Sequence, residues 1–478
     1  MRGMTRDHSR TSPLTGSLRW VRAAQPRSEQ GRWAQAAVIG AIGAASMFTL
    51  SAGALAVGAR VMARLPLVPQ QGLRHRPDLP VRAVHEDRVH VDRTKETERE
   101  GYLAVRQSGG AVHVRLGPVT SHPTPTTVAR PLLGADTSEP LQVAKAAVNG
   151  FYWAGSPRTA HGLETEEVEV SSPVGPMPAW LVRADHTKEP GQGPGHGPDQ
   201  GRDQEPGAGS AQEAPGGQGD TWAILIHGHG SMRGEALRVI PLLHRLGLTT
   251  LTITYRNDTG APASADRMYH LGADEWEDTE AAIDFALAHG ARRIVLFGWS
   301  MGGGIALRTS VRTAHRDRVV GLVLDSPAVD WQDILIYHAT ALKAPKPMRN
   351  LGIWMMTSTV GRRLVRLHEP LALHEMTPQY YAEHLIHPTL LFHALDDATV
   401  PPGPSRHLAA LRPDLVEFAP FEGASHTREW NRDPVRYERL LADHLGRLLG
   451  LEAEAAALEV PVRDLASPAL EDSIGLRL

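Results

Sequence analysis

The sequence contains no cysteine, few aromatic residues and almost no net charge. Without cysteine, its 478 residues can form no disulfide and no thiolate metal site, and they offer no cysteine nucleophile. The 50 Lys and Arg residues nearly balance the 53 Asp and Glu residues, so the net charge of −3 gives no indication of a nucleic-acid partner. Hydrophobic residues make up 41% of the chain, an ordinary fraction for a globular protein. We therefore expect a sizeable core in a chain long enough for two domains.

Charge is also absent from one long stretch near the N-terminus. Residues 33–59 contain no charged side chain over 27 positions, whereas a helix needs only about 20 residues to span a bilayer. We predict a single-pass membrane anchor here, preceded by a basic tail over residues 1–32. One alternative is a cleaved signal peptide with a cleavage-like site at Ala54-Leu55-Ala56, which would make the protein secreted. Another is a buried Ala- and Gly-rich helix. Four arginines lie within twenty residues on each side, so the positive-inside rule leaves the membrane orientation open.

The next part of the chain predicts small β structures and one insertion. Residues 60–160 contain short strand-like segments, such as 101–105 and 111–116, broken by proline and glycine, and we expect a juxtamembrane stretch followed by a small β-rich accessory region. Residues 164–183 alternate apolar and polar side chains around a turn, which predicts a β hairpin. Residues 189–220 are rich in glycine and proline and carry no apolar side chain larger than alanine, so we expect a disordered insertion.

From residue 220 onward, apolar strand-like segments alternate with helical patterns. The strand candidates are residues 222–226, 249–255, 293–297, 319–324, 389–393 and 415–419. The helix candidates are residues 233–246, 274–289, 302–315, 404–411 and 430–449. Together with the hairpin, this alternation predicts an α/β domain over residues 164–450, with a mostly parallel central sheet and helices on both faces.

One connection in this domain is much longer than a crossover requires. Between Leu324 and Thr389 lie 64 residues, compared with the roughly 10–12 that a minimal crossover needs. The apolar residues in this stretch recur at helical spacing, so we predict a helical cap over residues 328–388. Residues 451–478, after the last helix candidate, are expected to form a polar tail.

A single serine stands between two glycines directly after the strand candidate 293–297. The segment reads Phe297-Gly298-Trp299-Ser300-Met301-Gly302. In a sharp turn from a strand to a helix, the residues two positions before and after the apex approach so closely that a Cβ would clash. Glycines at these positions would therefore expose the Ser300 hydroxyl at the C-terminal edge of the sheet. The motif is short, and the glycines could instead serve only the turn.

A serine hydroxyl needs a general base and an orienting carboxylate to act as a nucleophile at neutral pH. Both residue types follow later strand candidates. Asp397 comes shortly after residues 389–393, and His426 comes shortly after residues 415–419. The C-terminal ends of parallel strands lie at one edge of a sheet, so we expect these side chains to meet near Ser300.

With these motifs the sequence resembles the α/β-hydrolase superfamily over about residues 164–450, specifically its membrane-associated or secreted bacterial serine hydrolases of esterase or peptidase-like type. The chain order Ser300, Asp397, His426 is the order found in that superfamily. The matching segments are HGHG at 227–230, GWSMGG at 298–303, LDSP at 324–327, D-x-x-V-P at 397–401 and GASHTREWN at 423–431. The resemblance implies the α/β-hydrolase fold with a helical cap insertion, to which we add the predicted N-terminal transmembrane helix.

The resemblance also implies roles for individual residues. Ser300 would be the nucleophile, His426 the base and then the acid, and Asp397 the orienting carboxylate. Asp396, adjacent in sequence, and Asp325, after the preceding strand candidate, are the alternatives for the carboxylate.

A hydrolase of this kind also needs an oxyanion hole. We expect the backbone N–H of Met301 and that of His229 to donate, with Gly228 as the alternative to His229. His227 and His229 have the spacing of an H-x-H metal pair, but no carboxylate accompanies them, so we expect no metal. No phosphate-binding or dinucleotide-binding glycine motif is present, so no cofactor is expected.

The sequence therefore predicts a membrane-anchored serine hydrolase that transfers an acyl group to water. We expect esterase-like action on a small-molecule acyl ester, with peptide substrates second and acyl transfer to an alcohol third. The alternative of another class is a non-catalytic, membrane-tethered binding protein that retains the fold.

Overall fold

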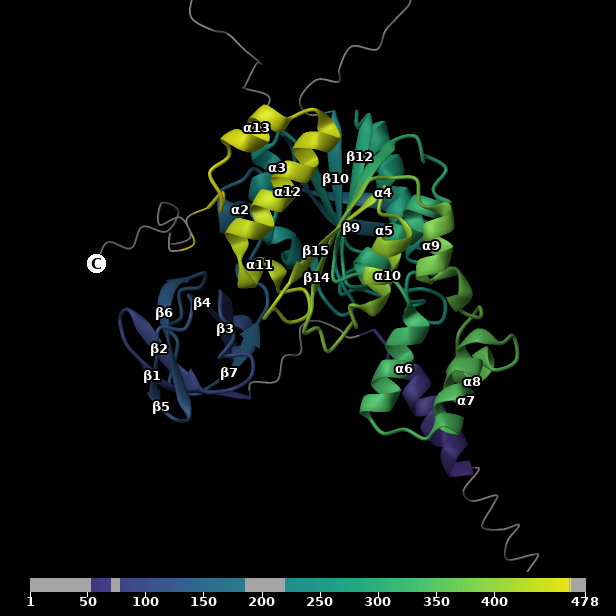
Figure 1. Ribbon diagram of the computed structural model, residues 1–478, viewed down its shortest axis with the longest axis horizontal. Coiled ribbons are helices and arrows are strands. Elements are labelled where there is room, and N and C mark those ends of the chain that lie inside the picture. The colour runs from purple at the N-terminus through teal and green to yellow at the C-terminus, as the bar shows by residue number, and fades with distance from the viewer. Residues whose placement is uncertain (1–52, 70–77, 185–219, 464, 466–478) are drawn as a thin grey trace, which may run out of the picture. The chain divides into compact units, whose positions relative to one another are not determined.

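The residues that the computed structural model describes are 53–69, 78–184, 220–463 and 465 (Figure 1). The predicted basic tail, most of the predicted membrane span, nearly all of the predicted insertion and the end of the C-terminal tail lie outside them. The chain divides into two compact units, residues 1–57 and 58–478, and the architecture below belongs to the second. Within the described residues, no helix combines the length and the apolar character that crossing a bilayer requires.

The first sheet is formed by seven short strands. They are β1 (Leu79–Val84), β2 (Arg88–Asp92), β3 (Leu103–Gln107), β4 (Val112–Leu116), β5 (Ser121–Thr124), β6 (Thr127–Ala135) and β7 (Lys145–Asn149). Their order is β2-β1-β7-β3-β4-β6-β5, and β2 also pairs with β6, so the sheet closes on itself and leaves β5 outside the ring. Alternating valines and leucines of these strands form one apolar core. This sheet is the small β-rich region that the sequence predicted.

The second sheet has eight strands. They are β8 (Glu166–Ser172), β9 (Gly175–Val182), β10 (Thr221–Ile226), β11 (Thr249–Ile253), β12 (Arg293–Trp299), β13 (Val319–Asp325), β14 (Thr389–Ala394) and β15 (Val416–Phe421). Their order is β15-β14-β13-β12-β10-β11-β9-β8, in which β10 to β15 run parallel and the β8–β9 hairpin joins β11 antiparallel. Every strand that the sequence predicted in this domain is present, with ends shifted by one or two residues.

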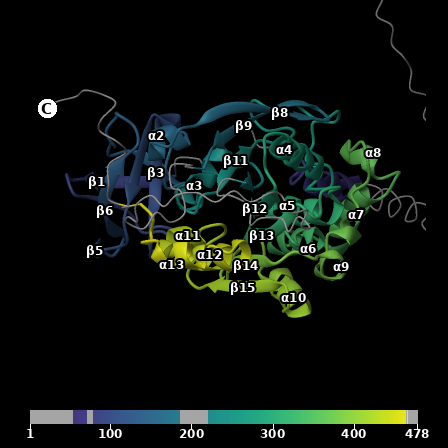
Figure 2. The same ribbon diagram turned by 90° about the horizontal axis from the view of Figure 1, so that it is seen from above.

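Helices cover both faces of this sheet. Successive side chains of its strands point to opposite faces, and the apolar side chains on each face form a separate core with the helices. Along β10, Trp222, Ile224 and Ile226 join one apolar cluster, whereas the residues between them join the other. The first face carries α4 (Trp276–Ala288), α5 (Met301–Arg312), α9 (Pro378–His384) and α10 (Gly403–Leu411). The second carries α3 (Ile240–Arg245), α12 (Pro434–Leu449) and α13 (Glu452–Ala457), and Figure 2 shows α4 and α12 on opposite sides of the sheet.

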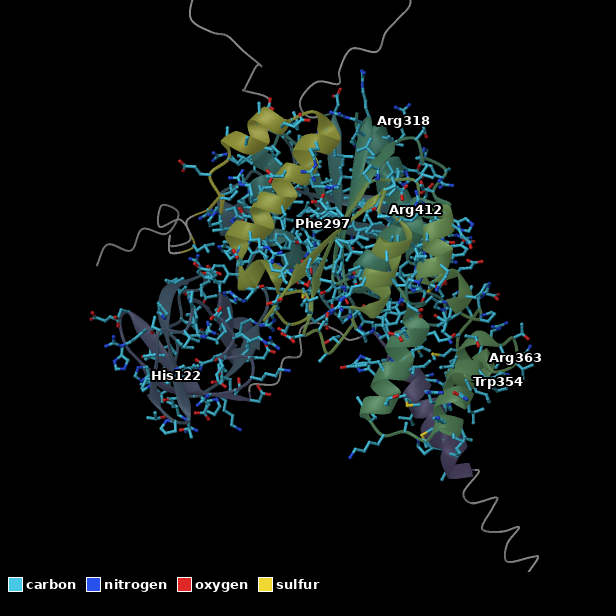
Figure 3. The ribbon with its side chains drawn as sticks, in the orientation of Figure 1. His122, Phe297, Arg318, Trp354, Arg363 and Arg412 are labelled. Carbon is cyan, nitrogen blue, oxygen red and sulfur yellow. The ribbon has the colours of Figure 1, made fainter. Side chains whose placement is uncertain are left out.

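The long connection between β13 and β14 contains the helices α6 (Trp331–Ala341), α7 (Lys346–Thr357) and α8 (Arg362–Val365), which form a cap, and then α9, which covers the sheet. The cap is therefore shorter than the predicted range of residues 328–388. Met355 and Met356 on α7 are buried in the first apolar cluster, while Trp354 beside them is 44% exposed (Figure 3). The cap therefore uses one face of α7 to pack against the body of the domain.

A segment from the N-terminal side of the closed sheet packs against this cap. Residues 58–64 are helical, and the carbonyl of Ala59 lies 3.2 Å from where a Cβ on Gly352 of α7 would be. Arg60 and Arg64 donate to the backbone carbonyls of Leu364 and Val365 at 2.7 and 2.8 Å. The last two residues of the predicted membrane span, 58 and 59, thus belong to the compact unit that contains the hydrolase sheet.

The structure differs from the sequence prediction at the C-terminal tail. The stretch predicted as a polar tail from residue 451 begins with the helix α13, and Leu458 and Leu465 beyond it are buried in the second apolar cluster. The backbone N–H of Val462 also donates to the Glu438 carboxylate at 2.7 Å. The prediction failed because these apolar residues are few and widely spaced, and they show neither helical nor strand periodicity.

The turn from β12 to α5 depends on two glycines. A Cβ on Gly298 would lie 2.2 Å from the carbonyl oxygen of Gly302, and a Cβ on Gly302 would lie 2.1 Å from the carbonyl oxygen of Ile226 on β10. Both distances are far shorter than a van der Waals contact, and both involve backbone that cannot move alone. The sequence prediction that these glycines permit close approach is therefore confirmed.

We expect the substitution Gly302→Ala to destabilise the protein by about 1–3 kcal/mol or more, because the added methyl group must displace β10. The matched control is Gly403→Ala at the start of α10, where a Cβ would meet nothing within 4 Å. That control should be neutral or slightly stabilising. Urea unfolding of both variants tests the prediction, and equal midpoints for the two would contradict it.

Candidate active site

Ser300 occupies the turn between β12 and α5 in a strained conformation. Its φ of 52° and ψ of −116° lie outside the regions that residues with a side chain normally adopt. Its backbone N–H donates to the carbonyl of Asp325 at 2.9 Å, and its own carbonyl accepts from the N–H of Ala328 at 2.9 Å. The end of β13 and the residues after it thus hold the turn in place from both sides.

The structure brings Ser300, His426 and Asp397 together in one chain of hydrogen bonds. Nε2 of His426 lies 2.8 Å from the Ser300 hydroxyl, and Nδ1 of His426 lies 2.6 Å from Oδ2 of Asp397. The three residues follow the C-terminal ends of β12, β15 and β14. With Nδ1–H donating to the carboxylate, Nε2 is left with a lone pair that can accept the serine proton.

The environment of Asp397 keeps its carboxyl ionised. Burial by itself would raise the pKa of Asp397, but hydrogen bonds from His393 and His426, the charge of His426 and the backbone N–H of Val400 hold that pKa below its usual value. Its Oδ1 accepts from the backbone N–H groups of Thr399 and Val400 at 2.7 and 2.9 Å. These bonds fix the carboxylate so that Oδ2 points at the histidine.

The two alternative carboxylates have other partners. Asp396 accepts from the backbone N–H of Gly423 at 3.2 Å, which supports the loop that carries His426. Asp325 is fully buried, and its Oδ2 accepts from the Tyr437 hydroxyl at 2.9 Å. Among the described residues, Asp397 is the carboxylate that lies within hydrogen-bonding distance of His426.

One predicted oxyanion donor, Met301, directly follows the serine, and the loop of the other lies beside it at Gly228. Met301 is the first residue of α5, so its N–H has no acceptor within the helix. Gly228 lies so close to the turn that a Cβ there would be 3.1 Å from Cβ of Ser300. However, the Gly228 N–H donates to Oε2 of Glu235 at 3.0 Å, so it is already engaged. This leaves His229 as the predicted donor from that loop.

The imidazoles of His227 and His229 do not share a ligand position. His227 is buried, and its Nε2 lies 2.8 Å from Oδ2 of Asp258. Nε2 of His229 instead lies 2.8 Å from the carbonyl oxygen of Pro66, and the ring packs edge-on against Tyr269. Each ring therefore anchors the loop to a different neighbour. In the sequence no carboxylate accompanies these histidines, but the fold brings Asp258 to His227 from the loop after β11.

Glu235 and Arg238, which the sequence analysis did not identify, connect the loop after β10 with the loop that carries the histidine. Both lie in the 3₁₀ helix η2 (Arg233–Arg238) and are buried. Glu235 holds the Gly228 N–H and also accepts from the Ser231 hydroxyl at 2.8 Å. Arg238 lies 3.4 Å from Glu235 and donates to the carbonyl of Thr427, next to His426, at 2.6 Å. The buried ion pair thus orients both loops.

A second buried carboxyl supports the same histidine loop. Glu429, three residues after His426, begins the short helix α11 (Glu429–Arg432) and is fully buried. Its Oε1 accepts from the Ser326 hydroxyl at 2.6 Å and from the N–H of Ala394 at 2.7 Å. Burial, together with the nearby charge of Asp325, raises the pKa of Glu429 well above its usual value. The loop is therefore tied to the ends of both β13 and β14.

A pocket of about 310 Å³ borders the loop that follows β10 and the residues that follow β11. Its aromatic wall consists of Phe151, Trp153 and Trp180. His227 also lines it, one residue before the Gly228 that contacts Ser300. Charged side chains such as Arg233 and Asp258 also line it, so the pocket has a mixed lining and a size suited to part of a small molecule.

With the fold and these contacts established, comparison with known families identifies the chain. Residues 223–470, more than half of the chain, match the model of the alpha/beta hydrolase family. The chain belongs to that family. Residues 80–149, which form the closed β sheet, match a separate domain of unknown function (DUF8805).

Similar solved structures include esterases and peptidases. The esterase Pf2001 of Pyrococcus furiosus is 16% identical, with a TM-score of 0.43 over 62% of this chain and 95% of that one. A puromycin-hydrolysing peptidase of Mycobacterium tuberculosis is 20% identical, with a TM-score of 0.44 over 78% of this chain and 54% of that one. A serine hydrolase of Xanthomonas campestris, described as lacking a lid, is 15% identical, with a TM-score of 0.37 over 59% of this chain and 94% of that one.

We expect Glu235→Ala to lower kcat by about 10²-fold, the scale of losing one oxyanion donor, because the loop of Gly228 and His229 loses its anchor. KM should change little, and Glu235→Gln, which keeps one acceptor oxygen, should recover part of the loss. The control is Ser231→Ala, which removes the other group that donates to the same carboxylate oxygen. Steady-state kinetics on a chromogenic ester provide the measurement. Equal kcat for wild type and Glu235→Ala would contradict the proposed positioning role.

Proposed function

We propose that this hydrolase cleaves an ester through a covalent acyl-enzyme in which Ser300 is the nucleophile. The observation that supports this most strongly is the pair of short contacts that His426 makes, 2.8 Å to the Ser300 hydroxyl and 2.6 Å to Asp397. A nucleophile within reach of a base, with the base oriented by a carboxylate, is the arrangement that acyl transfer requires.

In the first half of the reaction, Oγ of Ser300 attacks the carbonyl carbon while Nε2 of His426 takes its proton. The carbonyl oxygen becomes an oxyanion, to which the N–H groups of Met301 and His229 donate. When the tetrahedral intermediate collapses, His426 gives the proton to the leaving alcohol. The acyl group remains on Ser300, and Asp397 stabilises the imidazolium that forms along the way.

In the second half, His426 removes a proton from a water molecule, which attacks the acyl carbon. The second tetrahedral intermediate releases the carboxylic acid and returns the proton to Oγ of Ser300. The same steps cleave an amide when the leaving group is an amine, so peptide substrates are the second candidate. We propose that the aromatic pocket beside His227 receives an apolar part of the substrate, since it borders the loop whose Gly228 approaches Ser300.

Labelling with a fluorophosphonate probe tests the role of the three residues. We expect the wild type to be labelled and Ser300→Ala to remain unlabelled, because the probe reacts with an activated serine. Asp397→Asn should lower kcat by about 10⁴-fold, since it favours the wrong tautomer of His426. The matched control is Asp396→Asn, next to it in sequence, which should keep near-wild-type activity because the amide oxygen can still accept from the Gly423 N–H. An unlabelled but folded wild type would favour the non-catalytic binding protein.

We further propose that the uncharged segment beginning at residue 33 anchors the protein to a membrane. Supporting this are the absence of charge over residues 33–59 and the place where the compact hydrolase unit begins, at residue 58. A segment that ends near residue 57 would still contain about 25 uncharged residues, enough to span a bilayer.

Carbonate extraction of membranes tests the anchor independently of the chemistry. We expect the full chain to stay in the membrane pellet, because a spanning helix resists extraction. A variant without residues 1–52 should be soluble and still react with the fluorophosphonate probe. Release of the full chain would contradict the anchor, and a shortened, soluble product cleaved near Ala56 would establish the signal peptide instead.

A further inference from the structure

Two histidines and two aspartates outside the candidate active site converge at the contact between the cap and the body of the domain. Asp266, His270 and Asp274 lie in the connection between β11 and α4, and His368 follows α8 at the end of the cap helices. One ligand atom each from Asp266, His270 and His368 lies within 4.8 Å of the others. Residues almost a hundred positions apart in the chain therefore place nitrogen and oxygen atoms that can bind a metal ion close together.

The three donor atoms at that point are Oδ2 of Asp266, Nε2 of His270 and Nδ1 of His368. The carboxylate oxygen lies 2.8 Å from the nitrogen of His270 and 3.0 Å from that of His368. Ligands of a tetrahedral ion with bonds of about 2.0–2.1 Å are separated by roughly 3.4 Å. The three groups would thus need to open by about half an ångström to admit such an ion, which side-chain rotation can supply.

The second nitrogen of each ring faces the other aspartate. Nδ1 of His270 lies 3.2 Å and Nε2 of His368 lies 3.1 Å from Oδ2 of Asp274. As the side chains stand, both rings are hydrogen-bonded to Oδ2 of Asp266 instead, and Oδ2 of Asp274 has no hydrogen-bond partner among the described residues. An ion bound on the Asp266 side would leave the distal N–H of each ring to donate to Asp274. Histidine ligands of metal ions are commonly oriented in this way by a carboxylate on the distal nitrogen.

Without an ion, the ring nitrogens that face Asp266 donate to its carboxylate. An ion at that point would replace these two protons, and the neighbouring rings, whose centroids are 4.3 Å apart, would then share it with the carboxylate. A single divalent ion satisfies all three donors and balances the charge of the two carboxylates.

We propose that Asp266, His270 and His368 bind a divalent transition-metal ion of the zinc class, with Asp274 orienting both histidines. Two imidazoles and one carboxylate are a donor set that suits zinc and its neighbours better than magnesium or calcium. The His368 side chain is 39% exposed, which leaves an entry path and room for a water ligand, whereas His270 is buried.

The bound ion would link the cap to the body of the hydrolase domain. His368 directly follows the cap helix α8, and its backbone N–H also donates to Asp266 at 2.9 Å. The loop of Asp266 and His270 also contains Tyr269, against which the His229 ring packs. Metal binding would therefore hold in place both the cap and a neighbour of the predicted oxyanion loop.

The test uses the full chain, freed of any purification tag and stripped of metal with a chelator. Titration with ZnCl₂ by isothermal calorimetry should show one equivalent bound at micromolar concentration or below, and thermal denaturation should show a higher midpoint with zinc. Binding of Co²⁺ should give the visible absorption of a low-coordinate site. We expect His368→Gln to weaken zinc binding at least 10-fold, and Asp274→Asn to weaken it 10- to 100-fold.

The matched control is His315→Gln, which removes a histidine paired with Asp284 at 2.7 Å elsewhere on the surface. It should bind zinc like the wild type. His368 is partly exposed, so its variant is expected to fold, and circular dichroism checks this. Absence of stoichiometric binding by the wild type would overturn the proposal. So would zinc binding or zinc-dependent stabilisation that persists unchanged in His368→Gln, since the cluster would then be a set of hydrogen bonds only.

Discussion

The hydrogen bond between the Ser300 hydroxyl and His426 is the contact on which the account of this protein depends. It joins residues that are 126 positions apart in the chain, and it forms only if three strands of one sheet end at the same edge. The parallel order of β12, β13, β14 and β15 meets that condition. The two glycines of the serine turn meet the other condition, since they let β10 and α5 approach closely enough to leave the hydroxyl at the apex. Sheet topology and backbone geometry therefore bring the side chains of Ser300 and His426 together.

Buried ionisable groups around this contact fix the loops that carry it. Glu235 and Arg238 link the loop after β10 to the residue after His426, and Glu429 links the histidine loop to the ends of β13 and β14. Burying charged or ionisable groups is costly unless each finds partners, and here the partners are backbone groups of the catalytic loops. The groups that are costly to bury are thus the same groups that hold these loops in position. Such an arrangement is expected at a site that requires exact geometry as well as stability.

Much of this architecture could be predicted from the sequence because its signals are local. The apolar runs of the strands, the glycines around Ser300 and the surplus length between β13 and β14 are visible within short windows, and each corresponds to an element of the structure. The carboxylate next to His426 could be chosen as Asp397 only from a resemblance, because Asp396 and Asp325 fit the spacing argument equally. The structure separates them by showing that Gly423 and Tyr437 occupy the other two.

Other features escaped prediction because no local signal encodes them. Glu235 and Arg238 look like ordinary charged residues of a surface helix, and only the folded chain shows that they are buried. The spacing of Asp266, His270 and Asp274 is regular in the sequence, but His368 joins them through the cap, far along the chain. The order beyond residue 451 depends on isolated leucines that find a place in a core built by distant helices. In each case the structure depends on contacts between residues far apart in the sequence, and not on a periodic pattern within one segment.

The most direct test of the central claim is to trap the acyl-enzyme. The purified protein is mixed with a slowly hydrolysed activated ester, quenched in acid within the first turnover, digested and analysed by mass spectrometry. The peptide containing Ser300 should gain the mass of the acyl group, and this adduct should be absent in His426→Ala. Continued ester hydrolysis with the peptide of Ser300 unmodified, or an acyl group on another residue, would contradict the central claim.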